Sequence, residues 1–142
     1  MKYLLDTNVI SELLAKNPNE RVTEWIDTRE PDSVYLSVVT IGEIQRGIER
    51  LGHSRRKETL TKWLQEDLLE RFQGRVLEVG IKVMLRWGLL TAEMERKGRQ
   101  LPAIDSLIAA IALDYDCVLV TRNEADFQAT GVKILNPWTQ VE

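Results

Sequence analysis

The stretch KYLLDTNVISELL, residues 2–14, decides the fold. Its first half is a short apolar run that ends at Leu5, and its second half has the residue pattern of a helix that begins directly after Asp6. A strand that runs into a helix is typical of α/β proteins, in which ligands bind outside the carboxyl ends of parallel strands. Asp6 therefore occupies a place where a carboxylate, a divalent cation and a phosphate can meet.

Further short apolar runs follow the first one, and helical patterns separate most of them. This alternation predicts an α/β fold with a parallel sheet covered by helices. Two of the helical patterns, Leu60–Phe72 and Ile81–Met94, are expected to form long adjacent helices, and the alanine-rich pattern Ile104–Ala112 to form a central one. The predicted strands are Tyr3–Leu5, Val34–Ser37, Val76–Val79, Val118–Thr121 and Val132–Leu135.

The composition is that of one soluble domain, which we expect to span residues 1–142, with 44% hydrophobic residues to form a core. The net charge is −3, from 19 basic and 22 acidic residues, so a nucleic acid has to be bound by a local patch or through a metal. The single Cys117 excludes a disulfide framework and favours a cytoplasmic location. No apolar run approaches the roughly 20 residues that span a bilayer, so no membrane association is expected.

Asp6 and Asp105 both lie near the predicted start of a helix. Acids are common there because they cap the helix or interact with the positive end of its dipole. Each residue taken singly is therefore explained by helix capping or a first-turn position as well as by metal binding.

Glu43 and the acidic end of the chain are equally ambiguous when they are taken singly. Helical geometry places Glu43 off the apolar side of its helix, near Arg46 and Arg50, which favours a solvated glutamate with ion-pair neighbours. After the predicted strand that ends at Thr121, Asn123 is a candidate helix cap and Asp126 a candidate solvated acid.

Several motifs in a fixed order resemble the PIN-domain proteins, and among them the VapC and FitB-like toxins. The resemblance extends over nearly the whole chain. The motifs are LLDTNVISE (4–12), SVVTIGE (37–43), DSLIAA (105–110), TRN (121–123) and NPW (136–138).

This resemblance implies a PIN-like three-layer α/β/α sandwich with a central parallel sheet. It also implies a metal-dependent endoribonuclease that uses Mg²⁺ or Mn²⁺ and acts as the toxin of a type II toxin–antitoxin pair. The implied partners are an RNA substrate, a second copy of the chain in a homodimer, and a cognate VapB-like antitoxin that covers the acidic site.

The resemblance also assigns roles to individual residues. Asp6, Glu43 and Asp105 match the three acids of the family's metal site. The fourth position of the pattern is often Asp in relatives and is Asn123 here, so Asp126, three residues later, is the alternative source of that charge. All five residues are candidate catalytic residues, and their oxygen atoms suit Mg²⁺, which prefers oxygen ligands and retains several waters.

Two clusters of basic residues are candidates for phosphate contacts. Arg46 and Arg50, with residues 55–57 beyond them, form one, and residues 96–99 form the other. Surface charge runs are common, so for any individual residue a place on a solvated helix end or loop is the favoured explanation.

Two other function classes stay open at this point. A HAD-type Mg²⁺-dependent phosphatase also begins with an acid at a strand end, but it has a second Asp two positions later, where this chain has Asn8. A noncatalytic PIN-like module that binds nucleic acid or protein is favoured by Asn123. Metal-dependent RNA cleavage that is lost in Asp6→Asn and Asp105→Asn distinguishes the nuclease from both.

Overall fold

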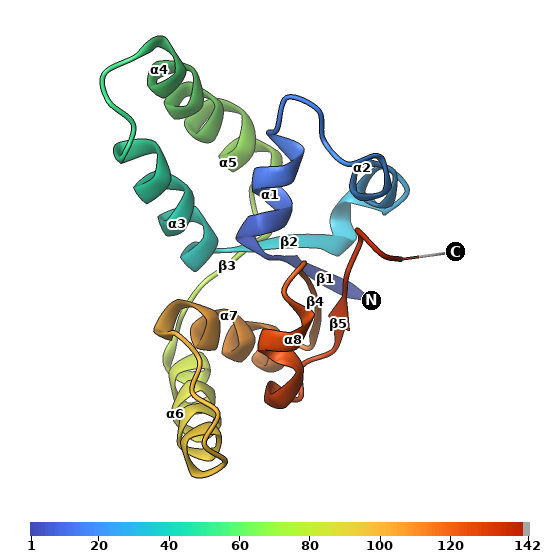
Figure 1. Cartoon of the computed structure of the whole chain (residues 1–142), viewed down its shortest axis with the longest axis vertical. Coiled ribbons are helices and arrows are strands. Elements are labelled where there is room, and N and C mark those ends of the chain that lie inside the picture. The colour runs from blue at the N-terminus through green and yellow to red at the C-terminus, as the bar shows by residue number, and fades with distance from the viewer. Residues whose placement is uncertain (141–142) are drawn as a thin grey trace.

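The computed structural model describes residues 1–140, in which a five-stranded sheet is covered by helices on both faces (Figure 1). The strands are β1 (Lys2–Leu5), β2 (Val34–Ser37), β3 (Val76–Leu77), β4 (Cys117–Val120) and β5 (Ile134–Leu135). The α-helices are α1 (Thr7–Leu13), α2 (Glu20–Asp27), α3 (Val38–Glu49), α4 (Arg55–Lys62), α5 (Leu69–Arg71), α6 (Ile81–Arg96), α7 (Ala103–Asp114) and α8 (Glu124–Phe127). The remaining turns are η1 (Pro31–Ser33) and η3 (Gln128–Thr130), both 3₁₀-helical, and the π-helical η2 (Trp63–Leu68).

All strand pairs are parallel, and the strand order is β3-β2-β1-β4-β5. This confirms the predicted parallel sheet. β3 ends earlier than expected because its partner β2 stops at Ser37, where α3 begins. Leu77 pairs with Ser37, and Val79 therefore has no strand residue to pair with.

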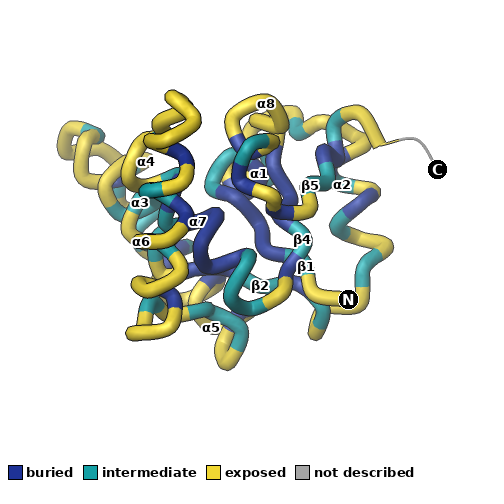
Figure 2. The backbone as a smooth tube through the Cα atoms, turned by 90° about the horizontal axis from the view of Figure 1, so that it is seen from below, coloured by how far each residue is buried: buried dark blue, intermediate teal, exposed yellow. Residues whose placement is uncertain are grey.

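Two hydrophobic cores lie on opposite faces of the sheet, which confirms the three-layer sandwich. Successive strand residues alternate between them: Leu4 and Leu119 belong to the core beneath α6 and α7, whereas Leu5 and Val120 belong to the core beneath α1, α2 and the α4–α5 segment. Figure 2 shows buried backbone along parts of β1, β4 and α7 and mostly exposed backbone along α4 and α6.

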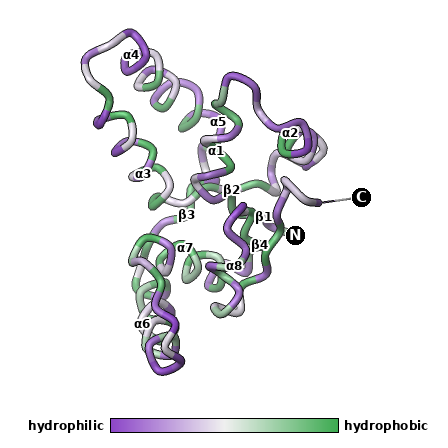
Figure 3. Tube along the Cα trace, viewed as in Figure 1, coloured by the Kyte–Doolittle hydropathy of each residue, from purple (hydrophilic) through white to green (hydrophobic). Residues whose placement is uncertain are grey.

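The expectation that Leu60–Phe72 and Ile81–Met94 form adjacent helices is wrong. The first pattern becomes α4, η2 and α5, which pack in the layer with α1 and α3, whereas α6 packs against α7 on the other side (Figure 1). β3 lies between the two patterns in the chain and at the edge of the sheet, so the chain passes there from one face of the sheet to the other. The predicted central helix is confirmed, since α7 is apolar over most of its length (Figure 3) and buries Ile108–Ala112.

The order of the strands also fixes where a ligand can bind. From β1 the chain continues outward to β2 and β3 on one side, and it returns to β4 and β5 on the other side. The crevice between β1 and β4 is therefore the topological switch point, which is the usual ligand site of an open α/β sheet. Within residues 1–140 no helix is long and apolar enough to cross a membrane.

Candidate active site

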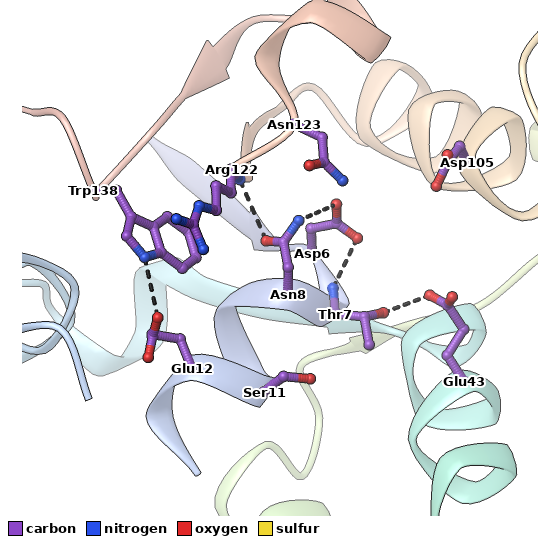
Figure 4. Close-up of a pocket in the computed structure, with 10 residues that line it drawn as sticks. All are labelled: Asp6, Thr7, Asn8, Ser11, Glu12, Glu43, Asp105, Arg122, Asn123 and Trp138. Carbon is purple, nitrogen blue, oxygen red and sulfur yellow. Dashed lines mark hydrogen bonds between the residues drawn. The ribbon is translucent and has the colours of Figure 1, made fainter. Parts of the chain in front are cut away.

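A pocket of about 500 Å³ opens at the carboxyl ends of β1 and β4 (Figure 4). It therefore lies at the switch point of the sheet. Its walls combine carboxylates, amides and hydroxyl groups with one arginine and one tryptophan. The lining residues are Asp6, Thr7, Asn8, Ser11, Glu12, Glu43, Asp105, Arg122, Asn123 and Trp138.

Asp6 lies at the centre of this pocket, at the point where β1 passes into α1. It is the N-cap of α1, and its Oδ1 accepts a hydrogen bond of 2.7 Å from the Thr7 backbone N–H. Its Oδ2 accepts hydrogen bonds from the Thr121 hydroxyl at 2.8 Å and from the Asn8 amide at 3.3 Å. Asp6 therefore does cap α1, but the cap uses only its Oδ1 atom.

The protonation of Asp6 is controlled mainly by its burial, since only 4% of the residue is exposed. Burial raises the pKa of this carboxyl above its ordinary value, and the negative charge of Glu43 acts in the same direction. The hydrogen bonds from Thr121 and Thr7 oppose that increase because they stabilise the ionised form. Asp6 is thus a fixed, desolvated carboxyl group whose ionised form would be stabilised by a nearby positive charge.

Glu43 reaches the same pocket from the second turn of α3. The Thr7 hydroxyl donates a hydrogen bond of 2.5 Å to Glu43 Oε1 and also approaches Thr40 Oγ1 at 3.2 Å. The expected solvated side chain with ion pairs to Arg46 and Arg50 is wrong, since none of the ion pairs within residues 1–140 includes Glu43. Glu43 instead turns toward α1, a neighbour that helical spacing alone does not reveal.

Asp105 enters the pocket from the first turn of α7. It caps nothing, because the N-cap position belongs to Pro102, and the described structure contains no hydrogen bond or ion pair to its carboxylate. Burial and, in the same direction, the negative charges of Asp6, Glu43 and Asp126 together raise the pKa of Asp105 to about 6. A half-buried carboxyl without a partner, beside other acids, suits a cation.

Asn123 and Asp126 are placed differently from each other. Asn123 occupies the N-cap position of α8, but its side chain makes no capping hydrogen bond there and lines the pocket, as Figure 4 shows. Asp126 is exposed on α8 and does not line the pocket, although its charge contributes to the raised pKa of Asp105. The structure brings Asp6, Glu43, Asp105 and Asn123 together and leaves Asp126 at the periphery.

Several residues in or beside the pocket were not predicted from the sequence. Asn8 lines the pocket and connects α1 to the end of β4, because it donates to the buried Thr121 Oγ1 at 3.1 Å and accepts from the Arg122 backbone N–H at 3.3 Å. The sequence signal was present, since Asn8 and Thr121 both belong to quoted motifs at strand ends. Arg122 and Trp138 also belong to quoted motifs, TRN and NPW, but those motifs assign them no place in the pocket, because the return of the C-terminal segment to the pocket depends on the tertiary fold.

The basic clusters expected to contact phosphate lie elsewhere. Arg46, Arg50 and residues 55–57 and 96–99 are absent from the lining of this pocket, and Arg122 is the cation that does line it. Arg56 lines a separate groove between α1, α3 and α4. Charge in the pocket is therefore strongly asymmetric, with four carboxylates and one guanidinium among the lining residues.

The donor set of the pocket consists of oxygen atoms without histidine or cysteine. Within residues 1–140, no three His, Cys, Asp or Glu side chains converge closely enough to hold an ion by themselves. The oxygen donors of the pocket suit Mg²⁺, which is usually bound by one or two carboxylates and completes its shell with water and substrate phosphate. They do not suit a zinc site, whose ligands are mainly nitrogen and sulfur.

Comparison with known proteins agrees with this architecture. The PIN-domain pattern matches residues 3–133. The chain is 36% identical to the toxin FitB of Neisseria gonorrhoeae, over 95% of this chain and 97% of that protein, and 33% identical to VapC ribonuclease Y4jK of Sinorhizobium fredii, over 95% and 96%. The crystal structure of FitAcB from Neisseria gonorrhoeae superposes with a TM-score of 0.93 at 36% identity, covering 97% of this chain and 99% of that one. With this match over most of its length, the chain belongs to the PIN-domain family.

Proposed function

We propose that this protein is a metal-dependent endoribonuclease and the toxin of a type II toxin–antitoxin pair. The observation that supports this most directly is the convergence of Asp6, Glu43 and Asp105, from three separate elements, on one pocket at the switch point of the sheet. The names of the relatives, a toxin and a ribonuclease, support the same activity.

The cofactor that fits this pocket is Mg²⁺, with Mn²⁺ as the alternative. PIN-domain ribonucleases are metal-dependent in general. Here Asp6 and Asp105 would be the direct ligands, and Glu43 with Asn123 or Asp126 would hold water. A bound divalent cation activates water and stabilises negative charge on the phosphate.

The side chains of this pocket prepare the site in three ways. Thr121 and Thr7 fix the two oxygens of Asp6, so the carboxylate does not need to reorient when it binds a ligand. The Thr7 hydroxyl holds Glu43 within reach of the same space. Asp105 carries a carboxyl with a pKa of about 6, so it changes charge near neutral pH and is sensitive to a bound cation.

The antitoxin is proposed to occupy an apolar groove of about 370 Å³ between α1, α3 and α4. Thr7 and Ser11 line both this groove and the acidic pocket, so a segment bound in the groove leads directly to the active site. The groove walls include Ile10, Leu14 and Trp63, which offer apolar contact along one side of α1. An amphipathic segment with a basic end would match the groove and the pocket together.

A homodimer is proposed through the outer face of α6. Ile81, Leu85 and Leu89 follow one another at intervals of one helical turn and are 80%, 65% and 72% exposed. A contiguous apolar stripe on the surface marks an interaction site more often than isolated apolar residues do. The proposed activity acts on cellular RNA, so we place the protein in the cytoplasm.

The phosphatase alternative is disfavoured by the surroundings of Asp6. Both of its oxygens accept hydrogen bonds, and the residue two positions later is Asn8, which donates to Asp6 instead of acting as a second acid. The noncatalytic alternative rests on Asn123 in place of a fourth acid. Cleavage assays separate it from the nuclease.

The test is cleavage of a panel of structured and single-stranded RNAs by antitoxin-free protein in Mg²⁺, Mn²⁺ or EDTA. Asp6→Asn is the matched control, because an amide of the same size can still accept from one neighbour and cap α1. Cleavage in Mg²⁺ or Mn²⁺ that is absent in EDTA and in Asp6→Asn supports the proposal. Equal cleavage by parent and variant would contradict it, and no cleavage by the folded parent would favour the noncatalytic module.

A further inference from the structure

Arg122 and Trp138 form the wall of the pocket that faces the acids, and the proposed chemistry leaves them without a role. The Arg122 guanidinium lies over the Trp138 ring at 5.2 Å from its centroid, within the range of a cation–π contact. Figure 4 shows this pair on one side of Asp6, with Glu43 and Asp105 on the other side.

The N–H groups of the Arg122 guanidinium donate no hydrogen bond within residues 1–140. Its backbone N–H donates to Asn8 Oδ1, but none of the ion pairs within residues 1–140 includes its side chain. This is notable in a pocket with four carboxylates, since a free arginine in such a place is attracted to pair with one of them. The side-chain contact that Arg122 does make is with the Trp138 ring.

Trp138 is itself held by hydrogen bonds on two sides. Its indole N–H donates to Glu12 Oε1 at 3.1 Å, and its backbone N–H donates to Asn136 Oδ1 at 2.9 Å. Asn136 is buried, and its amide donates to Glu124 Oε2 at 3.0 Å. The indole ring is therefore anchored to α1 through Glu12, and the backbone of Trp138 is connected through Asn136 to Glu124 of α8.

We infer that Arg122 binds a backbone phosphate of the RNA substrate and that Trp138 positions Arg122 for this contact. The inference rests on the proposed ribonuclease function. A guanidinium presents a planar set of N–H donors that matches two phosphate oxygens, and it stacks on an aromatic ring without losing its charge. An acidic pocket repels RNA, so a cation on the side of the pocket opposite Glu43 and Asp105 gives the strand a point of attachment.

The experiment measures binding of a fluorescein-labelled single-stranded RNA by anisotropy over a range of KCl concentrations at fixed Mg²⁺. All proteins carry Asp6→Asn, so the RNA stays intact. Arg122→Gln is expected to weaken binding on the order of tenfold, because a hydrogen bond to a charged group is lost. It is also expected to lower the slope of log K against log salt by about 0.7, the value for one single-strand phosphate contact. Arg86→Gln, an exposed change on α6 away from the pocket, is the control for net charge.

The role of Trp138 is tested by comparing aromatic and aliphatic replacements. Trp138→Phe keeps a ring under the guanidinium and should bind RNA nearly as well as the parent, whereas Trp138→Leu should bind several-fold more weakly. If Trp138 acts through Arg122, adding Trp138→Leu to Arg122→Gln causes no further loss of affinity. Thermal unfolding of each variant checks that the fold is retained, and Arg122→Lys should recover part of the affinity.

Three results would overturn this inference. Equal RNA affinity and salt slope for Arg122→Gln and Arg86→Gln would remove the role of Arg122, and additive losses in the double variant would remove the positioning role of Trp138. In both cases cleavage by protein with Asp6 restored would leave the proposed function intact. If that protein neither bound nor cleaved RNA, the proposed function would fail and the inference with it.

Discussion

Asp105 carries a carboxyl group whose ionisation depends on its surroundings. Its pKa is about 6 in the folded protein because of burial and the charges of Asp6, Glu43 and Asp126, whereas the ordinary value is 3.8. A raised pKa means that the folded state binds the proton more tightly than the unfolded state. Asp105 therefore contributes stability that is fully present below about pH 3.8 and is lost as the pH rises through about 6.

We predict that Asp105→Asn removes this pH dependence. In EDTA, the free energy of unfolding of the variant should exceed that of the parent by an amount that grows from pH 4 to pH 7, because the amide stays neutral. Urea unfolding at a series of pH values measures the difference. Mg²⁺ should stabilise the parent above pH 6 and leave the variant nearly unchanged, since a ligand of the folded state raises its stability. Parallel curves for the two proteins would contradict the prediction.

At the scale of residues, the sequence predicted the acids of the pocket better than the residues that hydrogen-bond to them. Asp6, Glu43 and Asp105 stood in motifs that resemble a family, and the structure brings all three to one pocket. The hydrogen bond between Thr121 and Asp6 depends on the parallel register of β1 and β4, in which Leu5 pairs with Val120. A strand register cannot be read from a single sequence, so Thr121 could not be predicted as the hydrogen-bond partner of Asp6.

Helix α3 positions Glu43, and its first turn is held by a buried cap. The Ser37 hydroxyl accepts a hydrogen bond of 3.1 Å from the Thr40 backbone N–H, and Thr40 in turn contacts the Thr7 hydroxyl that donates to Glu43. The cap thus connects the end of β2 to the acidic pocket. Losing it affects both the helix and the site.

We predict that Ser37→Ala lowers the free energy of unfolding by about 1 kcal/mol, the usual effect of losing a helix N-cap. RNA cleavage should also fall, because the turn that holds Thr40 and Glu43 loosens. Ser54→Ala is the matched control, since Ser54 caps α4 by accepting from the Lys57 N–H, and α4 contributes no residue to the acidic pocket. Chemical unfolding and initial cleavage rates measure both effects. A fall in cleavage that is as large in Ser54→Ala would refute the specific role of α3.

At the scale of elements, periodicity identified the helices but not their neighbours. The pattern Leu60–Phe72 predicts one long helix, and the chain forms the end of α4, the π-helical η2 and α5 over these residues. The face of the sheet that two successive helices cover depends on where the strand between them joins the sheet. Here β3, which joins the sheet beside β2, separates the α4–α5 segment from α6. This information lies in long-range strand pairing, which helical spacing does not contain.

At the scale of the whole molecule, the outer face of α6 exposes the apolar side chains of Ile81, Leu85 and Leu89. This exposed apolar surface supports the proposed homodimer. We predict that Leu85→Gln combined with Leu89→Gln converts the dimer to a monomer, because both side chains are largely exposed in the single chain and would be buried in a pair. Light scattering coupled to size exclusion measures the mass. Leu69→Gln on α5 is the control, since Leu69 is 37% exposed away from α6. A parent that is monomeric at about 100 µM, well above the roughly micromolar range of a stable homodimer, would contradict the prediction.

In the proposed reaction the acids of this pocket direct water to an RNA phosphodiester. Cleavage of a defined RNA in ¹⁸O-labelled water, with mass spectrometry of the products, distinguishes this reaction from attack by the neighbouring 2′-hydroxyl. We expect one labelled oxygen in the new terminal phosphate after a single turnover, no 2′,3′-cyclic phosphate, and no product with Asp105→Asn. Unlabelled cyclic phosphate ends, or labelled product that persists in Asp105→Asn, would contradict it.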